Sequence, residues 1–144
     1  MNNFLTELLV PFPKDYIKQK PGKGGDYVIH GVVRQMLLDV VGFYDWCIDR
    51  EIYNGDKLTG CIGTLTIYVG EEAISVQGAG DVEHDQGTNG ANLKHAESDA
   101  FKRAAMNLGL GLHLWCGDEY FVYNKNKSKA EGGPSSETAG SESL

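Results

Sequence analysis

The stretch LTGCIGTLTIYVGEEAISV, residues 58–76, decides the fold of this chain. It is rich in Thr, Ile, Val and Tyr, which favour β-strands, and Gly70-Glu71-Glu72 interrupts it as a turn. Upstream, residues 46–53 alternate apolar and polar side chains and end at the hairpin turn Asn54-Gly55-Asp56. Three consecutive strands joined by short turns predict an antiparallel meander of residues 46–53, 58–69 and 73–76.

A long helix is predicted downstream of the meander, with Asn92 as its N-cap and an end near Gly109. One face of this helix carries small or apolar side chains at helical spacing: Ala96, Ala100, Phe101, Ala104, Ala105 and Leu108. Small residues allow a helix to lie close against a sheet. The predicted fold class is therefore α+β, an antiparallel β-meander with an N-terminal hairpin, packed against a long α-helix.

The residues before the meander predict two helices and that small hairpin. Residues 3–9 form a short amphipathic pattern, and residues 31–41 repeat apolar side chains at helical spacing. Extended segments at residues 15–20 and 27–29 flank the turn Pro21-Gly22-Lys23-Gly24-Gly25, which is a strong turn signal.

The residues after the long helix divide into an apolar part and a polar part. Residues 110–115 are apolar, and we expect them to be buried. After Tyr123 the composition changes to Asn, Lys, Gly, Ser and Glu, which is typical of a flexible segment. The predicted organisation is one folded domain over residues 1–124 and a flexible polar tail over residues 125–144.

The charge of the chain permits nucleic-acid binding without requiring it. A formal net charge of −7 argues at first against DNA, because phosphate neutralisation dominates such binding. The distribution is uneven, however. Between Lys14 and Arg34 lie five basic residues against two acidic ones, whereas between Glu71 and Asp85 lie five acidic residues and no Lys or Arg. A molecule built from such blocks can present a positive groove.

Several classes of protein are not expected from this sequence. No segment matches the GxxxxGK[ST] phosphate loop, so nucleotide hydrolysis and a nucleotide cofactor are not predicted. Three widely spaced cysteines without a CxxC pair predict buried thiols in a reducing cytoplasm rather than a zinc site. No apolar run approaches the roughly 20 residues of a membrane helix, and nothing resembles a targeting signal.

The acidic loop of residues 81–85 leaves two interpretations open. Asp81, Glu83, His84 and Asp85 could together hold a divalent cation, as a metal-dependent nuclease would require. No second group of ligands accompanies them at a defined spacing, so a solvated acidic loop without a metal is the favoured interpretation. The nuclease is retained as the alternative function.

Two groups of basic residues are candidates for binding DNA. Lys102-Arg103 lies on the long helix, where such a pair usually forms a solvated face, and Asp99 is placed to pair with Arg103. The second group surrounds the Gly-rich turn, where ammonium groups can meet phosphates and aromatic rings can stack on bases. It consists of Lys18, Lys20 and Lys23, with Tyr16 and Tyr27 nearby.

The order of these segments resembles the annealing domain of the Rad-fifty-two recombination-mediator family. The resemblance runs from Phe12 to Asn124 and rests on individually weak motifs that occur in the family's order. They are Asp15-Tyr16-Ile17, the Lys-containing Gly-rich turn, Tyr27-Val28, Gly42-Phe43-Tyr44-Asp45-Trp46, the helical segment from Lys94 to Ala104, and Asp118-Glu119-Tyr120.

The resemblance implies an ATP-independent protein that binds single-stranded DNA and anneals complementary strands in recombination and repair. It implies no catalytic residues, an annealing domain over residues 1–124, and assembly into a homo-oligomeric ring or spiral. Lys102 and Arg103 match the family's paired basic residues of the inner DNA site. Lys20, Tyr27 and Lys94 match further residues of that site, and Lys57 matches a lysine of a second, outer site.

The chain departs from the family's pattern at three places. Met106 stands where a further Arg follows the basic pair, residues 81–86 are acidic where relatives carry lysine, and Asp118-Glu119 occupies the place of a basic residue. We therefore expect one good DNA groove rather than two. The family's long partner-binding region has no counterpart in residues 125–144, which suits a phage or bacterial recombination system, and protein partners other than the chain itself are not predicted.

Overall fold

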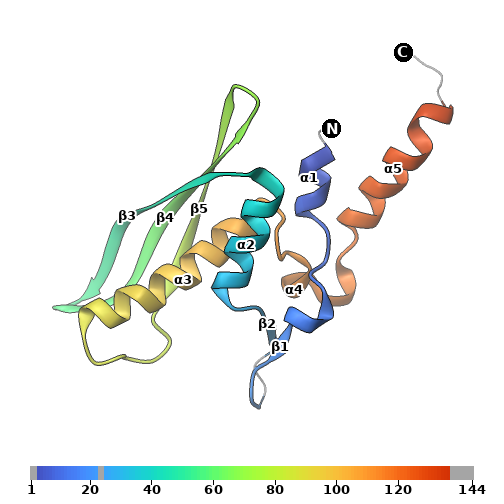
Figure 1. The fold of residues 1–144 in the computed structure, drawn as a ribbon. Coiled ribbons are helices and arrows are strands. Elements are labelled where there is room, and N and C mark those ends of the chain that lie inside the picture. Colours follow the sequence, from blue (N-terminus) through green and yellow to red (C-terminus); the bar gives the residue numbers. More distant parts are fainter. Residues whose placement is uncertain (1–2, 23–24, 137–144) are drawn as a thin grey trace.

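The computed structural model describes residues 3–22 and 25–136 and has the predicted α+β architecture (Figure 1). Its main sheet contains three antiparallel strands in the order β3 (Tyr44–Asn54), β4 (Lys57–Val69) and β5 (Glu72–Asp81). Gly55 and Gly70 turn the chain between them with φ angles of 65° and 62°, a conformation that glycine adopts without steric penalty. The predicted meander is confirmed.

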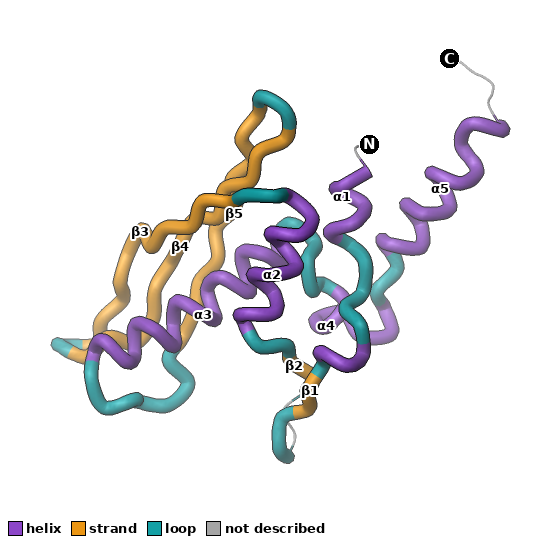
Figure 2. Tube along the Cα trace, in the orientation of Figure 1, coloured by secondary structure: helices purple, strands orange, loops and turns teal. Residues whose placement is uncertain are grey.

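Side chains along the central strand β4 alternate between a buried face of the sheet and a more exposed face. Cys61, Leu65 and Ile67 alternate along β4, and their side chains are fully buried on the side of the long helix. On the opposite face, the hydroxyls of Thr66 and Ser75 lie 2.8 Å apart across β4 and β5 and are exposed to solvent. Figure 2 shows the helices gathered on one side of the sheet, and none of the helices that the structure describes covers its other face.

The long helix α3 (Asn89–Asn107) begins four residues earlier than the sequence predicted, since its N-cap is residue 88 rather than residue 92. Its N-cap is Thr88, whose hydroxyl accepts a hydrogen bond from the backbone N–H of Ala91 at 3.1 Å. The prediction of Asn92 as N-cap is wrong. Asn92 is buried within the first turns of the helix, where its amide nitrogen donates to the Leu58 carbonyl at 3.1 Å.

Replacing Thr88 by alanine should lower the free energy of unfolding by about 1 kcal/mol, because the Ala91 N–H loses its acceptor. Thr88→Ser keeps the hydroxyl, so its free energy of unfolding should be close to that of the parent. Urea unfolding followed by circular dichroism, at one protein concentration, measures both variants. Equal stability of the alanine variant and the parent would show that this cap does not stabilise α3.

Helix α3 and strand β5 touch through their backbones. A Cβ atom on Gly80 would lie 2.1 Å from the Ala96 carbonyl oxygen, and one on Gly78 would lie 2.2 Å from that of Ala100. The predicted small-residue face of α3 is therefore the face that meets the sheet. Strand β5 extends five residues beyond the predicted end at Val76, because these glycines continue the strand where the helix crosses it.

The residues before β3 form helices around the small hairpin. Its elements are α1 (Asn3–Leu8), the 3-10 helix η1 (Lys14–Tyr16), β1 (Lys18–Gln19), β2 (Asp26–Tyr27) and α2 (His30–Val41). The antiparallel hairpin is confirmed, with Lys18 paired to Tyr27 and Gln19 to Asp26. The prediction that residues 15 and 16 are extended is wrong, since η1 includes them. Lys23 lies outside the described residues.

Helix α2 is joined to α3 and β3 through one carboxylate. Glu97 on α3 accepts hydrogen bonds from Arg34 on α2 at 2.7 Å and from the Trp46 indole on β3 at 2.8 Å. The Arg34 guanidinium also lies 4.1 Å from the centre of the buried Phe101 ring. A charge-assisted pair with these partners fixes the mutual orientation of three elements.

The C-terminal part is more helical than its composition suggests. It forms α4 (His113–Cys116), the 3-10 helix η2 (Gly117–Glu119) and α5 (Val122–Ser136), and α5 contacts α1. Residues 125–136, which the composition assigns to a flexible tail, are helical here, and α5 runs across the predicted boundary at residue 124. No helix among the described residues is long and apolar enough to cross a membrane.

Candidate nucleic-acid interface

A groove of about 910 Å³ lies between the small hairpin, helix α3 and the α4 region. Five of the predicted DNA-binding residues line it together, although they come from segments far apart in the sequence: Lys20, Tyr27, Lys94, Lys102 and Arg103. The hairpin supplies the first two and α3 supplies the other three. The fold therefore brings the two basic groups of the sequence to one surface.

Lys102 links α3 to the end of the hairpin. Its ammonium nitrogen donates to the Val28 carbonyl at 3.1 Å, directly after β2. Burial lowers the pKa of Lys102 from its ordinary value, an effect that Asp99 opposes and that the positive charges of Lys20 and Arg103 reinforce. A half-buried ammonium among like charges is an incompletely compensated cation, which an approaching phosphate would stabilise.

Arg103 is held between a carboxylate and an aromatic ring. Its Nε lies 3.4 Å from Asp99, the pair expected from their spacing of four residues, and its Cζ lies 4.9 Å from the centre of the Trp115 ring. The side chain of Arg103 is 44% exposed. The prediction that residues 110–115 are buried holds for Leu110 but not for Trp115, which is 55% exposed.

The groove contains acidic as well as basic side chains. Lys20 lies 4.0 Å from Glu83, and both are largely exposed. Within the described part of the chain, no carboxylate lies within ion-pair distance of Lys94 or Lys102. Because exposed ion pairs contribute about 0–1 kcal/mol, phosphate groups can replace such carboxylates at small cost. The acidic residues that line the groove are Asp26, Asp81, Glu83 and Asp99.

Two other predicted residues, Lys18 and Lys57, are not among the described residues that line this groove. Lys18 is exposed on β1 but is not among the lining residues. Lys23 is outside the described residues. Lys57, the residue matched to an outer site, begins β4 near the N-terminal end of α3 and lies 2.8 Å from Asp85.

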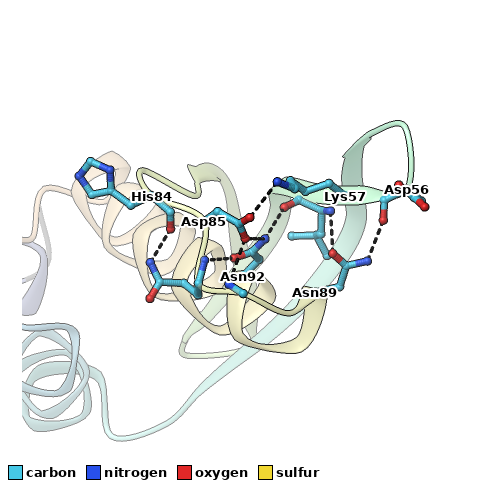
Figure 3. Close-up of polar contacts among 9 residues, drawn as sticks. Asp56, Lys57, His84, Asp85, Asn89 and Asn92 are labelled. Carbon is cyan, nitrogen blue, oxygen red and sulfur yellow. Dashed lines mark hydrogen bonds and ion pairs between the residues drawn. The ribbon is translucent and has the colours of Figure 1, made fainter.

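A network of hydrogen bonds, drawn in Figure 3, joins the acidic loop to the turn between β3 and β4 and to α3. Asp85 accepts from Lys57 at 2.8 Å, from the Gly87 backbone at 3.0 Å and from the Asn92 amide at 3.2 Å. Asn89 joins the same region by donating to the Asp56 carbonyl at 2.9 Å. The carboxylate that a metal ion would need is thus bound to protein donors, and the described residues contain no group of three His, Cys, Asp or Glu suited to a metal.

Because of this network, the free energy of unfolding should decrease at acidic pH. The hydrogen bond from Lys57, then those from Gly87 and Asn92, lower the pKa of Asp85 to about 2. Because the folded-state pKa lies below the ordinary value of about 4, the contribution is complete above pH 4 and is lost as pH falls toward 2. The stability advantage of the parent over Asp85→Asn should therefore shrink from pH 5 to pH 3 in urea unfolding. An advantage that does not change over this range would contradict the network.

The sequence did not place Trp115, His30 and His95 at the groove, although all three line it. Burial and the neighbouring Arg34 guanidinium lower the pKa of His30, which favours its neutral imidazole. One feature of the sequence could have pointed to Trp115 as a groove residue. Trp115 is the largest side chain in the segment that follows Gly109 and Gly111, whose positive φ angles of 105° and 79° mark turns directly after α3.

Comparison with known proteins agrees with this architecture. The chain matches the model of the family described as "Rad52/22 family double-strand break repair protein" over residues 1–132. A search of curated proteins finds no significant match. Since the family match spans nearly the whole sequence, and the meander packed on a long helix is the fold expected of that family, this chain belongs to the Rad52/22 family of double-strand break repair proteins, with a role in DNA repair and recombination.

Proposed function

We propose that this protein binds single-stranded DNA in the groove between the β1–β2 hairpin, α3 and α4, and that it anneals complementary strands without ATP. The observation that carries the proposal is the convergence of Lys20, Tyr27, Lys94, Lys102 and Arg103 on one groove. Cationic side chains neutralise phosphates, and phosphate contacts fix the path of a strand without reading its bases.

Annealing follows from such a groove because it requires no bond chemistry. Two strands must be straightened, screened from mutual repulsion and presented with their pairing edges free. A homo-oligomeric ring or spiral would repeat the groove, so that many weak sites hold one strand by avidity. We assign this activity to a domain of residues 1–124, of which the long helix and the hairpin carry the binding groups.

The annealing experiment uses two complementary labelled strands, without ATP and with Mg²⁺ or Mn²⁺. We expect accelerated duplex formation and intact strands. Cleavage of either strand would instead support the metal-dependent nuclease, and the absence of a mobility shift with single- and double-stranded DNA would contradict DNA binding altogether. Light scattering on the same preparation tests the oligomer, which a monomer at micromolar concentration would exclude.

A further inference from the structure

We propose that Trp115 is a base-stacking platform of the groove, and that each protomer holds one nucleobase against its indole ring. This inference rests on the proposed binding of single-stranded DNA and adds to it a contact with the bases. It follows from the position of the ring beside the basic pair, from its exposure, and from the way the chain holds it.

The indole faces the same space as the phosphate-binding groups. Trp115 lines the groove together with Lys94, Lys102 and Arg103, and 55% of its surface is exposed. An isolated exposed aromatic residue on a protein surface is ordinary. An exposed indole next to the basic side chains of a groove provides the two components of a single-strand binding site, a charge for the backbone and a π-face for a base.

The contact with Arg103 orients the two components relative to each other. The Arg103 Cζ lies 4.9 Å from the centre of the indole ring. The Arg103 Nε lies 3.4 Å from the carboxylate of Asp99, which is one turn earlier on α3. A phosphate can replace the Asp99 carboxylate at the guanidinium, and the neighbouring base then lies close to the indole. The ring is also anchored at its backbone, since the Trp115 N–H donates to the Leu112 carbonyl at 2.9 Å.

A stacked base is compatible with annealing. Stacking uses the flat face of a base and leaves its Watson–Crick edge free for the complementary strand. It also tolerates every sequence, because each base has a π-face. The inference therefore assigns Trp115 a role in spacing and orienting bases, whereas Lys102 and Arg103 act on the phosphates.

Tryptophan fluorescence gives a direct test, because the chain contains only one other tryptophan, Trp46, whose indole N–H is bonded to Glu97. Parent protein and Trp115→Phe are titrated with oligothymidylate while anisotropy of a labelled strand reports binding. We expect quenching in the parent that is absent in Trp115→Phe, although both bind DNA. Binding without any quenching in the parent would overturn the inference and leave the proposed function intact.

A strand of the same length made of abasic nucleotides separates base stacking from support of Arg103. Trp115→Ala should weaken binding of oligothymidylate by about fivefold or more, and Trp115→Phe should retain most of the affinity. Both variants should bind the abasic strand as the parent does. Equal losses on the two strands would show that Trp115 serves only to hold Arg103, and a changed particle size in light scattering would show that the ring belongs to a subunit contact. If the parent binds neither strand, the proposed function fails as well.

Discussion

Replacing Gly80 by alanine is expected to lower the free energy of unfolding by about 3 kcal/mol or more, a large part of the roughly 5–15 kcal/mol that stabilises a domain. The added Cβ would lie 2.1 Å from the Ala96 carbonyl oxygen and 2.4 Å from the Ala100 nitrogen. Both atoms belong to the backbone of α3, so no side-chain rotation relieves the overlap. The helix must lift from β5, which opens the packing of the whole small-residue face.

Urea unfolding at one protein concentration measures this effect, and Gly31→Ala is the matched control. Gly31 lies within helix α2, and a Cβ there would meet nothing within 4 Å, so alanine should stabilise the helix by about 0.5–1 kcal/mol. Adding Ala100→Gly to Gly80→Ala should not restore stability, because the overlap at Ala100 is with its backbone. A Gly80→Ala protein as stable as the parent would mean that α3 does not lie on β5 in this way.

The meander and the face of α3 could be predicted because their signals are local. Residues 58–69 have strand composition throughout, and the alanines of α3 repeat at helical spacing. The extent of β5 could not be predicted in this way. Glycine ordinarily weakens a strand, and only the position of α3 reveals that Gly78 and Gly80 are needed inside one.

The start of α3 and the C-terminal helix show a second limit. Thr88 and Asn92 are both good N-cap residues, and local sequence does not decide between them. The choice depends on the bond from Asn92 to the Leu58 carbonyl, which joins residues 34 positions apart. In residues 125–136 the polar composition indicated flexibility, whereas the structure continues α5.

The candidate site was predictable as a set of residues but not as a charge distribution. The ordered motifs selected Lys20, Tyr27 and the basic residues of α3, and these share one groove. The approach of Glu83 to Lys20 joins segments 63 residues apart, and no local pattern indicates it. Composition and motif order thus located the groove, whereas its acidic partners and Trp115 depend on tertiary packing.

Removing both charges of the basic pair, in Lys102→Ala/Arg103→Ala, should weaken binding of single-stranded DNA by roughly a hundredfold at low salt. Two charge-assisted contacts of about 1.5 kcal/mol each give a loss of this size. The dependence of binding on salt should also become weaker. The slope of log K against log salt concentration should fall by about 1.4 for two lost phosphate contacts on a single strand.

The control for this prediction is Lys125→Ala/Lys127→Ala, which removes the same net charge from exposed positions of α5. It should bind single-stranded DNA nearly as tightly as the parent does. This result would show that the loss in the groove variant is not caused by the change in total charge. Because Lys102 also bonds to the Val28 carbonyl, thermal unfolding must show that the double variant stays folded. The single variant Arg103→Ala keeps this bond and should show about half of the change in the salt slope. Asp99→Asn frees Arg103 from its carboxylate and should strengthen binding a few-fold. If the groove variant binds as tightly as the α5 variant at equal salt and oligomeric state, the strand lies elsewhere on the molecule.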